Sequence, residues 1–355
     1  MSKLPIIGIS IGDINSISVE VILKTLLDAR ILNYCTPLVY GSPKTIAFWK
    51  KHLNLGEIHF HQIQTLDQLH PKKNNLKIVW DEEIDIKPGE ANETGGKYAF
   101  KSLESATKDL VEGKIHALVT GPVNKNSIVI PNRKFAGHTE YIAEECGAKP
   151  LMILASQELK VALVTGHIPV SEISKQLSKE AILGKIRLFA NSLRSDFGIS
   201  KPRIAVLGLN PHAGDGGLLG KEEIEIIIPA VEAAQQENIG ILFGPYPADG
   251  FFGSGMHQQY DGVLAMYHDQ GLIPFKASAF MDGVNITAGL PVVRTSPDHG
   301  TAFAIAGKNE ANPASLRNAI YAALDILRKR NIHQEITHEP LPMTPFKRER
   351  FRIDF

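Results

Sequence analysis

Three histidines each come shortly after an apolar run that the pattern predicts to be a buried strand. Ligands of open α/β sheets bind outside the carboxyl ends of the strands, so these side chains could meet in one crevice. Three neutral imidazoles with an open coordination position suit a catalytic divalent metal ion. The alternative is three ordinary loop histidines, because their spacing matches no local metal-binding motif. The residues are His167 after 161–165, His212 after 204–209 and His268 after 263–267.

A second group of titratable side chains lies in the segment 266–276, where a predicted strand passes into a loop. Asp269 can orient the imidazole of His268 or act as a general base. Lys276 can hold a phosphate or a carboxylate group. The alternative is a solvated turn without a chemical role, and the spacing alone leaves both interpretations open.

Two further segments combine polar residues with a predicted helix start. His138 and Thr139 can contact a phosphate or hydroxyl group, or Thr139 can simply cap the helix that follows. The loop 210–217 contains three glycines and can offer backbone N–H groups to an anion. The acidic residues Glu222 and Glu223 argue against an anion there, because carboxylates already favour the positive end of a helix dipole.

The segment 285–302 is polar and rich in turn-forming residues. Its Arg294 offers a planar fork of donors for a phosphate or a carboxylate. On composition alone, a solvated surface loop with Arg294 facing water is an equal alternative. No Gly-x-Gly-x-x-Gly sequence follows a predicted strand and no Walker phosphate loop is present, so a nucleotide cofactor must be bound in another way.

The composition limits the class of protein. The 355 residues allow about two domains, and Lys plus Arg equal Asp plus Glu at 38 each. This balance argues against a protein that coats nucleic acid or an anionic membrane. The two cysteines, Cys35 and Cys146, argue against a disulfide framework or a cysteine zinc site. The sequence has neither a secretory signal nor an apolar run long enough to span a bilayer, so we expect a cytoplasmic protein without a membrane or nucleic-acid partner.

Short apolar runs alternate with longer amphipathic segments, which predicts an α/β fold with a central, largely parallel sheet. In the predicted helix 179–197, Ile182, Ile186, Phe189 and Leu193 share one face. No flexible linker marks a boundary, so we expect any division into two domains to be discontinuous in sequence. We expect strands at 6–11, 37–40, 77–80, 117–120, 151–155, 161–165, 204–209 and 263–267, and helices at 19–29, 97–112, 140–146, 179–197, 222–238 and 314–330.

Several of these motifs stand in the same order in the 4-hydroxythreonine-4-phosphate dehydrogenase family of pyridoxal phosphate biosynthesis, which the chain closely resembles from Gly12 to about Ser315. The segment 298–313 is also similar to the nucleotide loop of isopropylmalate and isocitrate dehydrogenases. That likeness implies that NAD, or alternatively NADP, binds without a Rossmann fingerprint. The most specific segments are 266–276 and 290–302, supported by 210–214 and 137–141.

The resemblance implies a fold of two α/β/α domains like that of isocitrate and isopropylmalate dehydrogenases. A nucleotide-side domain would comprise 1–130 plus 295–355. A metal- and substrate-binding domain, which also forms the dimer, would comprise 131–294. The active site would lie between the domains and be completed by the second subunit of a homodimer.

The resemblance also gives roles to the residues singled out above. It implies that His167, His212 and His268 ligate a divalent ion, which can be Zn, Mg, Mn or Co. It implies substrate contacts from His138, Thr139, Lys276, Asn285 and Arg294. Cofactor contacts would come from Asp298, His299, Gly300, Thr301 and Ala302.

The expected reaction is the NAD-dependent oxidation of 4-phosphohydroxy-L-threonine to 2-amino-3-oxo-4-phosphohydroxybutyrate, which decarboxylates to 3-amino-2-oxopropyl phosphate. The metal would acidify the substrate hydroxyl, and Asp269 and Lys276 are the candidate catalytic residues that accept its proton. One alternative is a paralogous dehydrogenase of a four-carbon sugar-acid phosphate. Alternatives of another class are a phosphate acyltransferase, which needs no three histidine ligands, and a non-catalytic binding protein.

The chain departs from the family pattern at three places. The segment 14–19 replaces a run rich in glycine and proline, so local contacts near the N-terminus can differ. Asp215 stands where a glutamate is common. Ala304 stands where an acidic residue is common in the nucleotide loop, and a carboxylate there could hold ribose hydroxyls. Its absence predicts weaker NAD binding or a changed cofactor preference.

Overall fold

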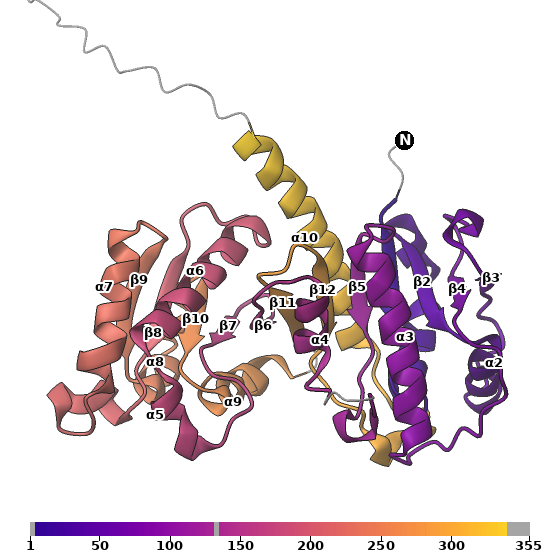
Figure 1. Ribbon diagram of the computed structural model, residues 1–355, viewed down its shortest axis with the longest axis horizontal. Coiled ribbons are helices and arrows are strands. Elements are labelled where there is room, and N and C mark those ends of the chain that lie inside the picture. The colour runs from indigo at the N-terminus through magenta and orange to yellow at the C-terminus, as the bar shows by residue number, and fades with distance from the viewer. Residues whose placement is uncertain (1–3, 131–134, 281, 339–355) are drawn as a thin grey trace, which may run out of the picture.

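The structure is a computed structural model that describes residues 4–130, 135–280 and 282–338. Within this part of the chain, the strands form one continuous twelve-stranded sheet in the order β3-β4-β2-β1-β5-β12-β11-β6-β7-β10-β8-β9 (Figure 1). The strands are β1 Ile6–Ser10, β2 Thr36–Gly41, β3 His61–Ile63, β4 Asn75–Ile78, β5 Ala117–Thr120, β6 Leu151–Ala155, β7 Lys160–Leu163, β8 Arg203–Leu207, β9 Ile241–Tyr246, β10 Gly262–Ala265, β11 Val284–Ala288 and β12 Val293–Pro297.

The strands are parallel in the two outer parts of the sheet and antiparallel at its centre. From β3 to β12 every neighbouring pair is parallel, and so is every pair from β7 to β9. Between them, β11 is antiparallel to both β12 and β6, and β6 is antiparallel to β7. The predicted α/β fold with a central, largely parallel sheet is confirmed. One sheet runs through both predicted domains, and their division remains a prediction.

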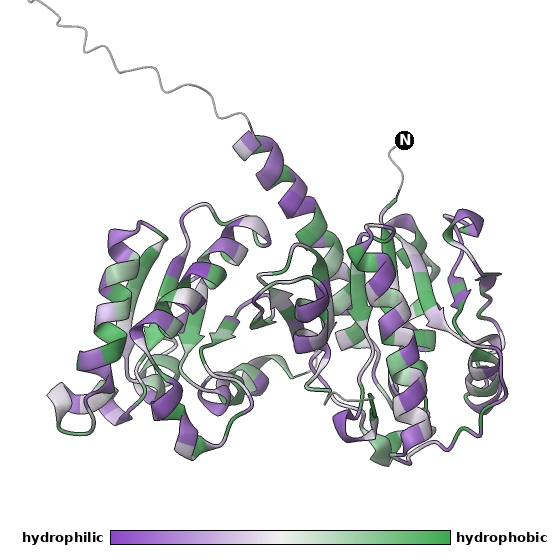
Figure 2. Cartoon of the chain, in the orientation of Figure 1, coloured by the Kyte–Doolittle hydropathy of each residue, from purple (hydrophilic) through white to green (hydrophobic). Residues whose placement is uncertain are grey.

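Helices cover both faces of the sheet, with mostly apolar strands between helices whose outer surfaces are polar (Figure 2). The predicted helix face of α6 is confirmed, since Ile182, Ile186, Phe189 and Leu193 are fully buried. The helices are α1 Ser18–Leu26, α2 Pro43–His52, α3 Glu93–Val111, α4 His138–Glu145, α5 Ile173–Gln176, α6 Lys179–Ser195, α7 Ile228–Gln236, α8 Ala248–Gly253, α9 His268–Ala279 and α10 Ala314–His338. No helix in these described segments is long and apolar enough to cross a bilayer.

The two faces of the sheet are packed differently. One hydrophobic core extends along a whole face, beneath α1, α2, α6, α7 and α10. The other face carries two smaller cores, one beneath α3 and α4 and one beneath α8 and α9. Side chains of a strand alternate between the faces, so Val284 and Ile286 of β11 join the continuous core while Asn285 and Thr287 face the opposite side. At the centre of the sheet, the face opposite the continuous core therefore carries polar side chains that can bind a ligand.

Of the two alternatives for the segment 285–302, the solvated surface loop is excluded. Most of this segment forms β11 and β12, in which Arg294 is only 3% exposed. The polar residues that resemble a loop in composition lie instead on the pocket face of two central strands. The prediction also missed β3, β9, α2 and α8, and it took α9 for a loop. The helix predicted at 222–238 is a π-helical turn, Glu223–Ile227, followed by α7.

Candidate active site

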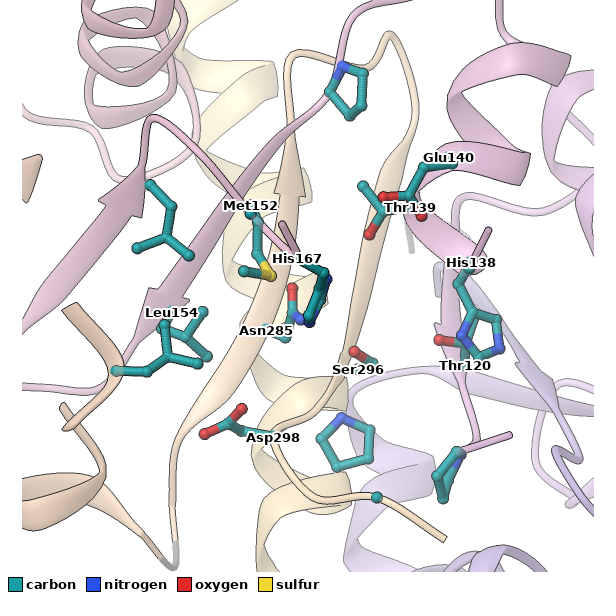
Figure 3. A pocket seen from close by; sticks show the side chains of 18 of the residues that line it. Thr120, His138, Thr139, Glu140, Met152, Leu154, His167, Asn285, Ser296 and Asp298 are labelled. Atoms are coloured by element: carbon teal, nitrogen blue, oxygen red, sulfur yellow. The ribbon is translucent and has the colours of Figure 1, made fainter. Parts of the chain in front are cut away.

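A cavity of about 450 Å³ lies on the sheet face between the two smaller cores. Its walls come from the carboxyl ends of β5, β7 and β12, from the first turn of α4, from one side of α9, and from side chains of β6 and β11 (Figure 3). Segments distant in sequence therefore meet here, as the strand-end argument predicts. Of the predicted site residues, those lining the cavity are His138, Thr139, His167, His268, Lys276, Asn285, Arg294, Asp298, His299 and Gly300.

Arg294 is a buried cation held by hydroxyl groups. Its guanidinium donates to Thr120 Oγ1 at 2.6 Å, to Thr287 Oγ1 at 3.0 Å and to Thr139 Oγ1 at 3.4 Å. Burial lowers the pKa of Arg294 to about 10, and the charge of Glu140 partly opposes this shift. Among the described residues no carboxylate forms an ion pair with Arg294. A buried charge without a partner of opposite sign is costly, so this site favours an anionic ligand.

Four buried polar atoms around the cavity have no hydrogen-bond partner among the described residues. They are His138 Nε2, Asn285 Oδ1, Arg294 Nε and His299 Nε2. An unpaired buried polar group is costly and needs an explanation, of which an absent ligand or water is one. Because all four belong to residues that line one cavity, a polar ligand bound there can satisfy them.

The electrostatic balance of the cavity is positive. Four basic side chains line it, against two carboxylates. The pKa of His138 is far below its usual value, because of burial and the nearby charges of Arg294 and Lys125, which leaves its imidazole neutral. The basic residues are Lys125, Lys185, Lys276 and Arg294, and the acidic residues are Glu140 and Asp298. A neutral imidazole beside a cationic wall fits a phosphorylated acid.

His167 and His268 lie together at the other side of the cavity, with ring centroids 5.0 Å apart. Burial and the charges of Lys125 and His268 lower the pKa of His167 and favour its neutral, metal-binding form. Asp269 Oδ1 is 2.6 Å from His268 Nδ1. This contact fixes the ring of His268 and leaves its Nε2 available, as the outer partner of a metal-bound histidine does.

His212 does not join this pair within the chain. It is exposed and does not line the cavity, and no group of three histidine, cysteine or acidic side chains in the described segments is placed to hold a metal ion. His212 stands at φ 53° in a left-handed turn, Pro211–Gly217, in which Ala213 and Asp215 also have positive φ. The predicted convergence of three histidines is therefore incomplete within one chain.

A buried carboxylate holds the start of this left-handed turn. Glu223 is 2% exposed and accepts hydrogen bonds from the backbone N–H groups of Leu209 and Asn210, each at 2.7 Å. These N–H groups are thus already paired with an internal anion, which argues against binding an external anion to them. The turn presents His212 at the surface.

Lys276 connects α9 with the segment after β12. Its Nζ lies 3.8 Å from Asp298 Oδ2. Burial raises the pKa of Asp298, and the charge of Lys276 opposes this. Burial lowers the pKa of His299, whose Nδ1 contacts the carbonyl oxygen of Gly300. The predicted catalytic lysine therefore meets the predicted cofactor segment at the cavity.

Besides His212, three predicted site residues lie outside the cavity lining. Asp269 is 69% exposed and contacts His268, which favours the orienting role over the role of base. Thr301 offers its carbonyl oxygen to the Ile17 N–H, and Ala302 is exposed in a left-handed conformation. The interpretation of Thr139 as a helix cap is wrong, because α4 begins at His138 and its cap is Gly137.

Sequence reasoning missed several residues that line the cavity or hold a residue that does. Thr120 ends a predicted strand and is followed by Gly121 and Pro122, so the strand-end rule could have found it. Thr287 lies behind the lining and accepts a hydrogen bond from Arg294. Lys125 and Lys185 carry no local signal, since the fold alone brings them to the cavity.

Fold and site together define an α/β protein with a cationic cavity at the centre of a mixed sheet, suited to a small, multiply anionic ligand. The family model described as pyridoxal phosphate biosynthetic protein PdxA matches residues 33–323. The chain belongs to this family, and the resemblance inferred from its motifs is confirmed.

Individual relatives agree with this assignment. The chain is 50% identical over 337 residues to a 4-hydroxythreonine-4-phosphate dehydrogenase of Bacteroides thetaiotaomicron, covering 94% of this chain and 92% of that protein. A protein of the same name from a Sulfurihydrogenibium species is 41% identical over 91% of this chain and 99% of its own length. The crystal structure of the Klebsiella pneumoniae 4-hydroxythreonine-4-phosphate dehydrogenase is similar with a TM-score of 0.78 and 36% identity, covering 92% of this chain and 98% of that one.

Proposed function

We propose that this protein is an NAD- and divalent-metal-dependent dehydrogenase of 4-phosphohydroxy-L-threonine. The product, 2-amino-3-oxo-4-phosphohydroxybutyrate, would lose carbon dioxide to give 3-amino-2-oxopropyl phosphate. Membership of the family and the names of the relatives support an oxidoreductase of pyridoxal phosphate biosynthesis. The homodimer and the cytoplasmic location remain predictions.

The buried guanidinium of Arg294 is the observation that carries this proposal. It lies in a cavity with three lysines, and its hydrogen-bond partners among the described residues are three threonine hydroxyls. The proposed substrate has a phosphate and a carboxylate, and a guanidinium fork matches either group with two parallel hydrogen bonds. Binding such an anion would remove the cost of the unpaired buried charge.

The two sides of the cavity would bind different groups of the substrate. Arg294, neutral His138 and Thr139 would bind the phosphate, with Asn285 Oδ1 free to accept a hydrogen bond from the substrate. Lys276 would lie near the reacting alcohol and carboxylate. This arrangement fixes both ends of the substrate and so orients the carbon that is oxidised.

The chain supplies two of three expected metal ligands at one place, His167 and His268, with Asp269 holding the second of them. We propose that His212 reaches this pair from a second subunit, since its turn is exposed and held rigidly by Glu223. When bound, a divalent ion supplies Lewis-acid polarisation of the alcohol, and NAD supplies the acceptor for the hydride.

Lys276 is the better candidate for moving the proton of the alcohol. Its Nζ lines the cavity, whereas Asp269 is exposed and already contacts His268. Asp298, 3.8 Å from Lys276, would keep this ammonium group in place after it has taken up the proton. The cation would also stabilise the negative charge that develops on the oxidised carbon and its carboxylate.

The test is NADH formation from 4-phosphohydroxy-L-threonine with the purified protein, in the presence of divalent metal and after chelation. We expect turnover that chelation abolishes and added metal restores. Four-carbon sugar-acid phosphates serve as competing substrates. Faster turnover of one of them would identify the paralogous dehydrogenase, and no turnover of any substrate by folded, metal-loaded protein would contradict a dehydrogenase.

A further inference from the structure

An ion pair on α1 holds the backbone at the far end of the segment after β12. We call residues 298–311 the β12–α10 loop. Glu20 Oε1 accepts a hydrogen bond from the Ala311 N–H at 2.9 Å. Lys24 Nζ donates to the carbonyl oxygens of Asn309 at 3.0 Å and Ala311 at 2.9 Å. Lys24 Nζ and Glu20 Oε1 are 2.7 Å apart. The ion pair as a whole therefore forms hydrogen bonds with three backbone groups of the loop.

The position of this pair in the protein is unusual for an intrahelical ion pair. The Glu20 side chain is fully buried and that of Lys24 is 18% exposed. Ion pairs between residues four apart on a helix normally lie on the exposed surface, where they contribute little to stability. A buried ion pair contributes little net stability, but it can specify one arrangement of the groups around it. The backbone groups that this pair binds belong to the β12–α10 loop.

Further contacts from the N-terminal part of the chain hold the same loop. The Ile17 N–H donates to the Thr301 carbonyl oxygen at 3.2 Å. His52 Nε2 lies 3.0 Å from the Gly307 carbonyl oxygen. Ile17 belongs to the segment 14–19, which departs from the family pattern, and it reaches the loop through its backbone. The loop is thus held at its start, middle and end by residues far away in sequence.

We propose that Glu20 and Lys24 are positioning residues that keep the β12–α10 loop in the shape that binds NAD. The inference rests on the proposed function and on the expectation from the family resemblance that residues 298–302 contact the cofactor. His299 Nε2, buried and without a partner among the described residues, supports a ligand at the start of the loop. A loop already held in its binding shape loses less conformational freedom when the ligand binds, and this raises affinity.

The test uses the full-length double variant Glu20→Gln/Lys24→Met, which removes the ion pair and the hydrogen bonds of Lys24 to the loop without leaving an unpaired buried charge. Its matched control, Asp325→Asn/Arg328→Met, removes an exposed ion pair of 3.3 Å on α10. We expect the Kd and the KM for NAD to rise about tenfold, while the KM for 4-phosphohydroxy-L-threonine stays within about twofold. Backbone amide exchange of residues 301–311 should accelerate. The control variant should resemble the wild type in every measurement.

Unchanged NAD affinity together with unchanged exchange in the β12–α10 loop would overturn the proposal. An equal rise of both KM values would also overturn it, because that result indicates general damage. If the double variant does not fold, the single variants decide: Lys24→Arg keeps the donors and should bind NAD like the wild type, whereas Lys24→Met should not. Wild-type protein that binds no NAD would contradict the proposed function, and the exchange data would then decide alone whether the pair positions the loop.

Discussion

The two sides of the cavity differ in how complete they are within one chain. On one side, Arg294 is buried and held by the hydroxyls of Thr120, Thr139 and Thr287. On the other side, His167 and His268 lie together, but His212 lies elsewhere at the surface. The anion-binding side is therefore prearranged by the fold of a single chain. The side with the two histidines is incomplete as a metal site, and we propose that a second copy supplies the missing ligand.

The difference follows from the elements on which the residues lie. Arg294 and Thr287 are on paired strands whose opposite faces are fixed by the continuous core, so their positions are set by the register of the sheet. His212 is on a turn of consecutive left-handed residues outside the sheet. This conformation costs free energy for non-glycine residues, and residues that adopt it cluster at functional sites, where the surrounding structure holds them in place. Presentation of His212 to a partner would be such a function.

The largest expected loss of activity comes from a substitution on the side of the cavity that contains Arg294. Arg294→Met should lower kcat/KM by about 10²- to 10⁴-fold, because two or more charged hydrogen bonds to the substrate are lost at roughly 1.5–3 kcal/mol each. Steady-state kinetics with 4-phosphohydroxy-L-threonine measure the change. The control is Arg328→Met on the exposed surface of α10, which should leave kinetics unchanged. Near-normal kcat/KM for Arg294→Met would remove the main support for the proposed function.

His212→Ala tests the proposed third ligand of the His167 and His268 pair. It should abolish metal binding and lower kcat by at least about 100-fold, while the melting temperature changes little. The reason is that an exposed side chain is removed from a turn held by Glu223 rather than by His212. Metal content by atomic spectroscopy and a thermal scan measure both quantities. Retained metal stoichiometry in this variant would contradict the role of His212.

Asp269→Asn separates the orienting role from the role of base. As the partner of His268 Nδ1, Asp269 should affect metal affinity by about 10- to 100-fold, with kcat at saturating metal within about tenfold of wild type. A metal titration of the activity measures the two parameters separately. A kcat that stays more than about 10³-fold low at saturating metal would instead identify Asp269 as the base.

Thr287→Val should give a smaller effect on the complete side. Loss of one acceptor of Arg294 should raise the KM for the phosphorylated substrate by about tenfold and leave the KM for NAD unchanged. Thr287→Ser keeps the hydroxyl and should restore most of the affinity. If the serine variant is as impaired as the valine variant, packing of the methyl group matters more than the hydrogen bond.

The sequence predicted the continuously apolar strands better than the partly polar strands β11 and β12. The strands predicted at 117–120 and 151–155 coincide with β5 and β6, because continuous apolar runs indicate strands buried on both faces. Polar and apolar residues alternate in β11, and β12 has three consecutive polar residues, so the composition of this segment resembles that of a loop. Most of the candidate site residues could be named in advance from strand ends and family motifs. The separate position of His212 could not, because it depends on the left-handed turn 211–217, which no local sequence pattern predicts.

We propose that a complete site combines His167 and His268 of one chain with His212 of another. The direct test is the isolated heterodimer of two differently tagged variants, His167→Ala and His212→Ala, each inactive as a homodimer. Exchange of His212 between subunits leaves one of two sites intact, so the heterodimer should show about half the wild-type activity and metal content. A heterodimer as inactive as its two parents would contradict the claim, because all three histidines would then have to act within the same chain.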